Sequence, residues 1–192
     1  MSRAEAFRLL TTSVDAWNGY RGRNPDWVPP KILADFHGGT LRNANLSKVD
    51  IAFSELHGVD CEGANFTDAN LRNCEFPNSS MIRANLSGAN LSYANLTSAD
   101  LESANLANAN LECADLTDAY LCDANLEGAR LNGAILIRAN LVGARLANAY
   151  LFCSDLSGAQ LNGADLSGAD LRKANLKDAS MDPSTLRDIR PT

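Results

Sequence analysis

Apolar residues recur every five positions along most of this chain. From Phe36 to Met181 an apolar residue stands at every position whose number ends in 1 or 6, without one insertion, and 23 of these 30 residues are leucine. The residue two places earlier is alanine in 23 of the 30 five-residue words and small to medium-sized in the others. The three remaining positions of each word are mostly polar, as in ANLSGANLSYANLTSADLES from Ala84 to Ser103.

A period of five fits neither an α-helix nor a single β-strand, whose side chains repeat every 3.6 and 2 residues. In a helix, successive leucines would be rotated by roughly 140° and would occupy every face. In one long strand, each face would receive polar and apolar words in turn. The pattern therefore predicts a chain that turns a corner after every word, with the leucine and alanine positions pointing inward.

This A-[DN]-L-x-x pattern resembles the pentapeptide repeat family over residues 34–183. The resemblance implies an all-β fold, a right-handed quadrilateral parallel β-helix (a solenoid) with four words in each coil and about seven and a half coils. Residues 20 apart should then stack on one face, and hydrogen bonds between coils should satisfy the backbone. The family is abundant in cyanobacteria, so a cyanobacterial member is the expectation.

The N-terminal end of such a stack needs a cap, because a terminal coil exposes unpaired backbone groups and apolar side chains. Residues 1–33 are expected to form a cap with one helix and a loop. Ser2 and Glu5 match a capping box, and Asn18-Gly19 is a plausible helix end. Trp27 is expected to anchor the loop over the first coil. One face of the helix is predicted to be apolar through Phe7, Leu10, Val14 and Trp17.

At the C-terminal end, the five-residue repeat stops after residue 183. Residues 184–192 are predicted to form a short C-terminal cap or tail, with Pro183 at the first turn of a helix. Leu186 and Ile189 are expected to fold back over the last coil. The same two residues leave open a homodimer formed through an end cap, which is the way that some members of the family associate.

Charge and cysteine content narrow the classes of partner and compartment. The formal net charge is −6, which argues against direct binding of nucleic acid or an anionic membrane and leaves a basic protein as a partner. No apolar run is long enough to span a bilayer, and the first residues do not read as a signal peptide, so a cytoplasmic location is expected. The five cysteines are odd in number and lack a Cys-x-x-Cys pair, which favours neither a disulfide framework nor a zinc site.

Acidic residues gather on two adjoining faces of the predicted rod. There the acids outnumber the bases by nine, whereas the other two faces balance. Because family members mimic duplex DNA and bind DNA gyrase, the resemblance implies one function for such an edge, a DNA-mimicking binder or inhibitor of gyrase or another topoisomerase. A merely solubilising surface is the alternative. The acidic edge comprises Asp35, Glu55, Asp60, Glu62, Glu75, Asp100, Glu102, Asp115 and Asp118.

One coil carries large apolar residues where most words place Asn, Asp, Ser or Gly. Such residues predict a contact surface for another protein if they gather on the outside. The alternative is that they are single exposed residues without consequence, since the four-sided shape spreads them over three faces. These candidate partner-binding residues are Ile135, Ile137, Val142, Tyr150 and Phe152.

His37 and His57 are 20 apart and should stack beside the acids of the same face. The favoured interpretation is that the imidazoles stack and partly neutralise these acids; a metal ion held by both imidazoles and a carboxylate is the alternative. No phosphate-binding loop, nucleophile motif or metalloprotease motif is present, so neither a cofactor nor an enzyme is expected. The sequence therefore favours a non-enzymatic protein–protein interaction rod or scaffold, with DNA mimicry or a regulatory or structural homodimer as alternatives.

Overall fold

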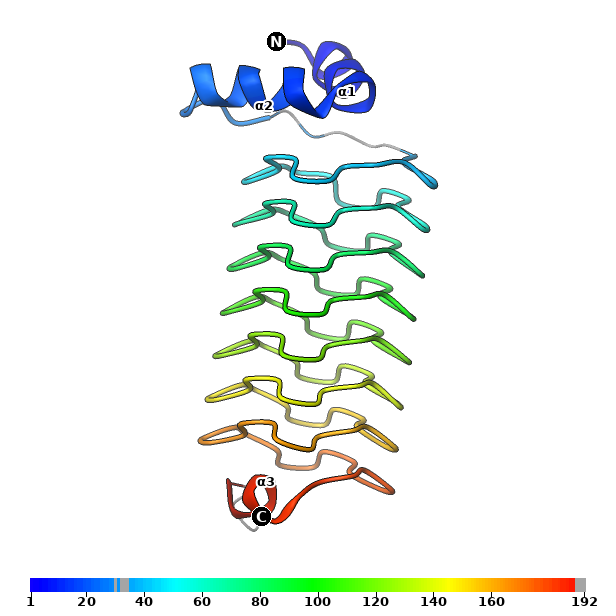
Figure 1. Ribbon diagram of the computed structural model, residues 1–192, viewed down its shortest axis with the longest axis vertical. Helices are drawn as coiled ribbons and strands as arrows, with labels where there is room; N and C mark the ends of the chain where they lie inside the picture. Colours follow the sequence, from blue (N-terminus) through cyan, green and yellow to red (C-terminus); the bar gives the residue numbers. More distant parts are fainter. Residues whose placement is uncertain (30, 32–34, 189–192) are drawn as a thin grey trace.

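A stack of coils forms the long axis of the molecule (Figure 1). Residues 20 apart are joined by parallel bridges throughout, from Asp35 with Glu55 to Gln160 with Ser180. Since each coil holds four words, the fold is the predicted right-handed quadrilateral β-helix, which is thereby confirmed. The structure is a computed structural model that describes residues 1–29, 31 and 35–188.

The interior is filled by the two periodic positions of every word. Leucines from Leu46 to Leu166 are fully buried, and the alanine positions between them are buried as well. The rings of Phe66 and Phe76 meet edge to face in this core, with their centroids 6.5 Å apart. Small alanine side chains let neighbouring walls approach while leucines fill the centre, so the rod has a packed interior rather than a channel.

Backbone hydrogen bonds explain why Asn or Asp so often precedes the apolar centre. In the word 64–68, four of the five N–H groups bond to carbonyl groups, within the same turn or on a neighbouring coil. The fifth, the N–H of Thr67, donates to the side-chain Oδ1 of Asn65 at 3.0 Å. The same bond joins Glu102 N to Asp100 Oδ1 at 3.1 Å. Asn and Asp therefore complete the hydrogen bonding of the coil, which Leu and Ala alone cannot do.

The last residue of each word adopts a left-handed backbone conformation. The backbone angle φ is positive at 19 non-glycine and 10 glycine residues. These 29 residues stand at every fifth position from 38 to 178. The values lie between 53° for Asn73 and 72° for Gly168. This conformation costs a non-glycine residue roughly 1–2 kcal/mol, so the coil is closed by regular turns that hydrogen bonding between coils stabilises.

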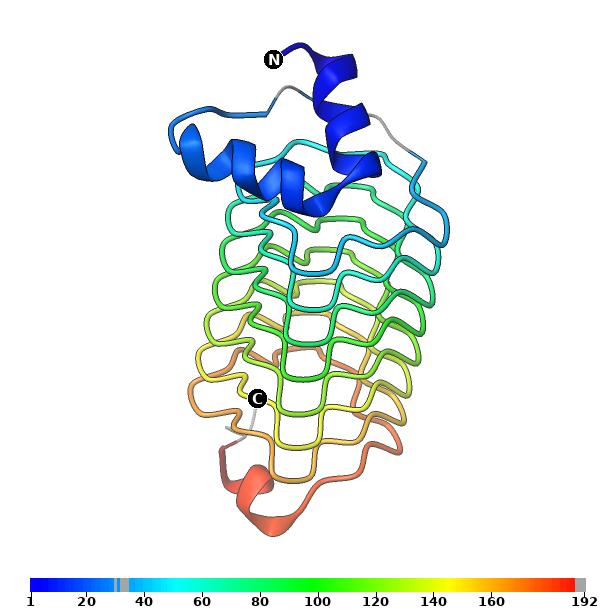
Figure 2. The same ribbon diagram turned by 45° about the horizontal axis from the view of Figure 1, so that its top comes forward.

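Two helices, rather than the one predicted, cover the N-terminal end. α1 spans Arg3–Thr12 and α2 spans Val14–Arg23, and they lie across the end of the coils (Figure 2). The predicted capping box of Ser2 and Glu5 is confirmed. The prediction of a single helix was wrong, because Ser13 has an extended backbone that ends α1. Its side chain caps α2 by accepting a hydrogen bond from Ala16 N. Helix α2 then continues past Asn18-Gly19.

Polar side chains of α2 satisfy the exposed edge of the first coil. Asn18 donates to the Asn43 carbonyl at 2.9 Å and accepts from Asn45 N at 2.7 Å. Arg21 is buried and donates to the Ser47 carbonyl at 2.7 Å, and its burial lowers the pKa of its guanidinium. The cap thus pairs backbone groups that would otherwise stand open at the end of the stack.

The C-terminal end is closed by α3 (Pro183–Asp188). Thr185 is buried and its hydroxyl donates to the carbonyls of Leu161 and Ala164, both at 3.2 Å. Asp182 accepts hydrogen bonds from Gly163 N and Ser184 N at 2.7 Å and 2.9 Å. The Leu186 side chain and the whole of Ile189, on which the predicted fold-back depends, lie outside the described part of the chain.

Candidate functional site

The residue that precedes each apolar centre changes character between residues 120 and 160. In the seven words from Asn85 to Asp115 it is always asparagine or aspartate and is partly buried. Over the next nine words, six of these residues are neither asparagine nor aspartate, and all six are exposed. We call these six residues the belt, because they follow the chain around all four faces: Tyr120, Arg130, Ile135, Arg145, Tyr150 and Gln160.

The belt lacks the hydrogen bond that Asn or Asp makes in most other words; outside the belt, five words also carry another residue at this position, namely Thr40, Glu55, Glu75, Ser80 and Ser180. Tyrosine, isoleucine and arginine side chains have no acceptor that can reach the N–H two residues later. One of these N–H groups finds a replacement, since Phe152 N donates to Asn132 Oδ1 at 3.2 Å. Arg130 and Arg145 instead form ion pairs, with Glu112 at 2.7 Å and with Glu127 at 2.9 Å. The belt therefore departs from the local rule of the fold.

The predicted partner-binding residues lie on and beside this belt. Tyr150 is 51% exposed, and Ile135, Val142 and Phe152 are 36–37% exposed. Ile137 is half-buried. They lie on three faces, as expected from their positions in the repeat, so they do not form one flat patch. Their role in binding stays a prediction.

Two exposed aromatic residues that the sequence analysis did not select lie at one corner of the rod. Phe53 is 60% and Tyr93 is 52% exposed, and both end words of the same face. The Nζ of Lys31 lies 5.3 Å from the Phe53 ring centroid, and the guanidinium carbon of Arg72 lies 5.0 Å from that of Tyr93. The sequence contained a signal for this pair: each coil has 20 residues, so Phe53 and Tyr93, which are 40 apart, belong to one column of turns.

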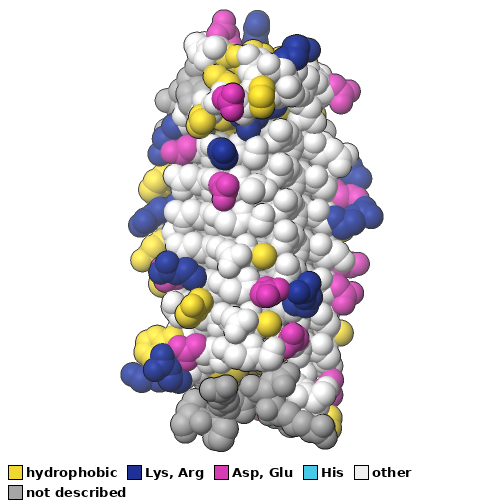
Figure 3. Space-filling model, turned by 90° about the vertical axis from the view of Figure 1, so that its left-hand side faces the viewer, with side chains coloured by type: hydrophobic (Ala, Val, Ile, Leu, Met, Phe, Trp, Pro, Cys, Tyr) yellow, Lys and Arg dark blue, Asp and Glu magenta, His cyan; other side chains and the backbone are white. Residues whose placement is uncertain are grey.

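Phe152 continues this corner toward the C-terminal end. Arg172 and Lys173 lie over its ring, 5.9 Å and 5.3 Å from the centroid. Figure 3 shows hydrophobic and basic side chains following one another down one long edge of the rod. We call Phe53, Tyr93 and Phe152 the aromatic corner. Cation–π contacts of this kind hold a base beside an exposed ring and present both to a partner.

The bases at the aromatic corner differ in whether an acid neutralises them. Arg172 forms a bidentate pair with Asp170, at 2.8 Å and 2.7 Å, and these hydrogen bonds lower the pKa of Asp170 to about 2. Within the described residues, Lys31, Arg72 and Lys173 form no ion pair. The corner therefore offers positive charge next to aromatic surface, although the whole chain is acidic.

A hollow beside Tyr150 adds concave shape to the belt. Tyr150 and residues from the turns of three successive coils line it, and Glu127 is the charged residue among them. Tyrosine beside a hollow is a frequent element of protein interfaces, since the ring buries much area and the hydroxyl binds water or a partner. The other lining residues are Ala107, Asn108, Gly128 and Asn148.

Arginines neutralise part of the predicted acidic edge. Arg42 contacts Asp60 at 3.0 Å and Glu62 at 2.6 Å, and Arg83 also contacts Glu62. The hydrogen bond from Arg83, followed by that from Arg42, lowers the pKa of Glu62. Three of the nine predicted acids are thus paired with an arginine, the third being Asp118.

Asp118 and the other acids of the edge also have local partners. Arg138 contacts Asp118 at 2.5 Å and lowers the pKa of its carboxyl group. Glu75 accepts a hydrogen bond from Asn95 at 2.7 Å, and Asp115 accepts one from the Thr117 hydroxyl at 2.6 Å. Only the arginine pairs offset negative charge, because the amide of Asn95 and the hydroxyl of Thr117 are neutral donors. DNA mimicry through this edge stays an untested alternative.

The remaining edge acids belong to two local groups, one stacked across two coils and one within a single turn. Asp35 and Glu55 are paired in register beside the two histidines, and Asp35 accepts a 2.9 Å contact from His37. The backbone N–H of His37 is the first cause of the lowered pKa of Asp35. Asp100 accepts the N–H of Glu102 in the usual turn. The edge is therefore a set of local pairs rather than one uniform charged strip.

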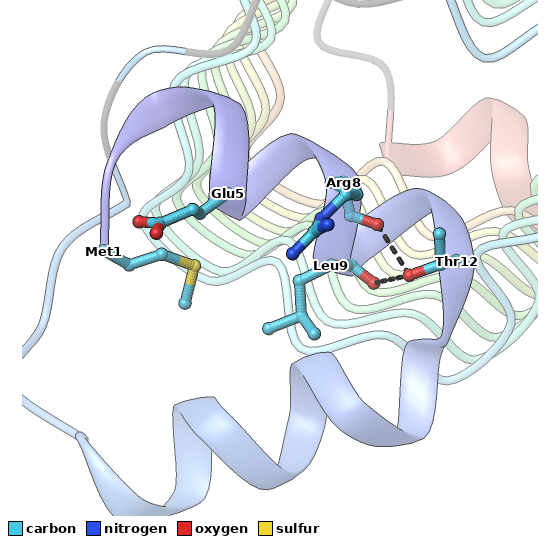
Figure 4. A pocket seen from close by; sticks show the side chains of 5 residues that line it. All are labelled: Met1, Glu5, Arg8, Leu9 and Thr12. Carbon is cyan, nitrogen blue, oxygen red and sulfur yellow. Dashed lines mark hydrogen bonds between the residues drawn. The ribbon is translucent and has the colours of Figure 1, made fainter.

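An open hollow on the helical cap is lined by α1 and by Met1, which precedes it (Figure 4). The Thr12 hydroxyl donates to the carbonyls of Arg8 and Leu9 at 2.7 Å and 3.4 Å. Glu5 already serves the capping box, so its carboxylate is not a free catalytic group. With Met1 as the remaining lining residue, the hollow has no convergent set of polar groups that would define a binding site.

The five cysteines are free thiols. Burial raises the pKa of Cys61 and raises that of Cys74 to about 12, so both are inert core residues. Cys113 and Cys153 are exposed, and Cys122 is half-buried. Among the described residues the thiols form no disulfide.

Fold and repeat together define a class of protein, the four-sided β-helices built from five-residue words. The sequence matches the family of pentapeptide repeats, and the chain belongs to the pentapeptide repeat family. No curated protein matches the chain in sequence. The matching segments overlap along the repeat: residues 33–67, 54–92, 64–102, 99–136, 114–151 and 149–188.

Solved structures of the same family resemble the chain. HetL, a pentapeptide repeat protein involved in heterocyst differentiation regulation from the cyanobacterium Nostoc sp. strain PCC 7120, is 27% identical, with 84% of this chain and 92% of HetL covered and a TM-score of 0.37. Rfr23 from the cyanobacterium Cyanothece 51142 is 31% identical, with 67% and 88% covered and a TM-score of 0.42. QnrB1, a plasmid-mediated fluoroquinolone resistance protein, is 18% identical, with 81% and 94% covered and a TM-score of 0.37.

None of the helices in the described ranges is long and apolar enough to cross a membrane.

Proposed function

We propose that this chain is a non-enzymatic rod that binds another protein through the belt and the aromatic corner. The observation that carries the proposal is the break in the repeat between residues 120 and 160, where exposed Tyr, Ile, Arg and Gln replace Asn and Asp. The packed interior supports a binding role over a catalytic one, because Leu and Ala fill the space in which a cleft would form.

The break weakens local structure without improving the core. Each Asn or Asp bond to the turn contributes about 0.5–1.5 kcal/mol, and six of nine consecutive words lack that residue. The side chains that replace it are exposed, so burial offsets little of the loss. Departures from a local rule without a structural gain are typical of functional surfaces. Tyrosine and arginine, which supply four of the six, are also enriched among residues that dominate protein interfaces.

The chemistry of the corner indicates what the partner presents. Arg72, Lys31 and Lys173 each lie over an exposed ring, and no acid among the described residues pairs with them. A partner surface with carboxylates between apolar side chains would complement this arrangement. We therefore expect a protein partner with an acidic and apolar contact surface, rather than the basic partner that the net charge alone suggests.

The exposed free thiols support a reducing compartment for this rod. Cys113 and Cys153 are exposed and unpaired, and such thiols persist where glutathione and thioredoxin keep them reduced. We include a cytoplasmic location in the proposal on this ground.

A site-directed cross-linking experiment tests the proposal. A photo-reactive phenylalanine analogue replaces Tyr150 in one bait and Ser103, in a regular word, in the control bait. We expect one protein to cross-link at position 150 and not at 103, and we expect Phe152→Ser to abolish that adduct. Adducts that are equal at both positions, or unaffected by Phe152→Ser, would contradict binding through this surface.

Sedimentation and salt distinguish the alternatives. If the cross-linked protein is a second copy and the sedimentation coefficient falls in the Phe152→Ser variant, the rod is a homodimer. A partner lost at high salt and in an Asp100→Asn/Glu102→Gln variant, but retained in Phe152→Ser, would instead favour the acidic edge and DNA mimicry. Salt screens contacts of Lys31, Arg72 and Lys173 with carboxylates as well as contacts of the acidic edge, whereas apolar contacts are not screened, so the two variants identify the surface.

A further inference from the structure

Two histidines stack at the N-terminal end of the rod, beside two carboxylates. The ring centroids of His37 and His57 are 4.3 Å apart, and the ring planes are inclined by 32°. One nitrogen of each ring and one carboxylate oxygen of Glu55 lie within 4.8 Å of one another. We propose that His37, Glu55 and His57 form a binding site for a transition-metal ion such as Zn²⁺.

The ligand chemistry fits such an ion better than Ca²⁺ or Mg²⁺. Two imidazole nitrogens and one carboxylate oxygen are typical ligands of zinc, nickel or copper, whereas calcium and magnesium prefer oxygen alone. Tetrahedral zinc would hold these atoms about 3.3 Å from one another, at metal–ligand distances of about 2.0–2.1 Å. The side chains of His37 and Glu55 are 50% and 62% exposed, so they can rotate toward an ion without disturbing the core.

Asp35 orients the first of these ligands. Its Oδ1 accepts the backbone N–H of His37 at 3.0 Å and lies 2.9 Å from the ring Nδ1. In this structure the same Nδ1 faces Glu55, 4.0 Å from its Oε2. In the tautomer that carries its proton on Nδ1 and donates it to Asp35, Nε2 keeps the lone pair that a metal requires, and the exposed ring would turn to present it. Metal-binding histidines usually donate their other ring N–H to a carboxylate in this way, so Asp35 is a positioning residue of the site.

The register of the repeat confines the site to two coils. One coil further along the same column, proline occupies the histidine position as Pro77, and Glu75 is held by Asn95 at 2.7 Å. An ion bound by His37, Glu55 and His57 would cross-link the first and second coils. A hollow lined by Asp35, His37 and Thr11 of α1 adjoins the ligands, so the link would form directly under the helical cap.

The test uses the fact that the chain contains two histidines, both in the site. Imidazole NMR signals of the full chain are followed during a ZnCl₂ titration, in a Cys113→Ser/Cys122→Ser/Cys153→Ser background that removes accessible thiols. We expect both imidazoles to respond together and to saturate at one ion per chain. Asp35→Asn should weaken the apparent affinity by about 10–100-fold.

Matched variants separate metal binding from general charge effects. His57→Gln should abolish the response of the remaining imidazole at the same zinc concentration, and Glu55→Gln should weaken it. Glu75→Gln, the same change one coil further along, should leave the titration unaltered. Far-ultraviolet circular dichroism of each variant checks that the β-helix is intact.

Hydrogen exchange supplies a second readout that does not depend on the imidazoles. Because the ion joins two coils, zinc should slow amide exchange in residues 36–41 of the original chain and not in the His57→Gln variant. The proposal is overturned if saturating zinc leaves both imidazole signals unchanged, or if His57→Gln binds zinc as well as the original chain and the Glu75→Gln control do.

Discussion

The indole Nε1 of Trp17 donates a 2.7 Å hydrogen bond to the backbone carbonyl of Asn45. This contact connects helix α2 to the first coil, and the Trp17 side chain is fully buried beneath the cap. The ring also meets Trp27 edge to face, with centroids 5.9 Å apart. The cap is therefore fixed to the rod through backbone groups that an uncapped coil would leave unpaired.

Trp17→Phe should weaken the cap while leaving most of the apolar packing in place. The Asn45 carbonyl would lose its donor in a buried setting, which costs about 1–3 kcal/mol. We expect amide exchange in residues 43–49 to accelerate by a corresponding factor while the central coils are unaffected. Equal exchange in the two proteins would show that the hydrogen bond does not hold the cap.

Asn110→Ala should destabilise the rod, whereas Gln160→Ala should not. The Oδ1 of Asn110 accepts the N–H of Glu112 at 3.1 Å, and its removal should cost about 0.5–1.5 kcal/mol. Gln160 occupies the same position in a belt word and makes no such bond within the described residues. Urea unfolding of both variants measures the difference, and equal losses would refute the turn role assigned to Asn and Asp.

Ser103→Gly should stabilise the rod, and Ser87→Gly should destabilise it. Ser103 has a φ of 55°, a conformation that glycine adopts without the steric cost borne by other residues. Ser87 lies one position earlier in its word, where φ is not positive, so glycine there only increases the freedom of the unfolded chain. We expect changes of about 0.5–1 kcal/mol with opposite signs in urea unfolding. Shifts of the same sign would contradict this explanation.

The C-terminal cap should loosen in acid through Asp182. Hydrogen bonds from the Ser184 hydroxyl and from the N–H groups of Thr185 and Gly163 lower the pKa of Asp182 below its ordinary 3.8. Because the folded-state pKa is depressed, the stabilisation is fully present above about pH 4 and is lost as the pH falls through the lower folded-state value.

Asp182→Asn provides the comparison for this pH dependence. The difference in urea midpoint between the original chain and the variant should be constant at neutral pH and should narrow as the pH falls below about 4. The Gly163 amide signal should move in the same range in the original chain only. A difference that stays constant into acid would exclude the carboxylate as the cause.

The N-terminal cap shows which local features the sequence predicts and which it does not. The N-cap role of Ser2 and Glu5 follows from four consecutive residues, and the structure confirms it. Ser13 was missed because the apolar spacing continues across it, whereas its extended backbone ends one helix and caps the next. Phe53 and Tyr93 were not predicted, because each is the only aromatic residue of its own coil to end a word and the two are 40 residues apart.

The pairing of charged side chains was the part of the site that the sequence predicted least well. Arg42 and Arg83 lie in different coils, yet both contact Glu62, which lies between them in the stack. The register places the three near one another, but the direction of each long side chain depends on the turn that carries it. Counting acids in a column therefore overestimated the free charge of the edge.

The sequence by itself determined the register, the buried positions and the four-sided coil, because one local pattern is repeated 30 times without an insertion. Each repetition places Leu and Ala inward and offers the same backbone bonds, so small local preferences add up to one fold. Only the tertiary structure decided that two helices form the cap, which acids are neutralised and which rings lie under a base. Those features depend on single side-chain contacts between coils, such as that of Arg72 with Tyr93, and no repetition along the chain reinforces them.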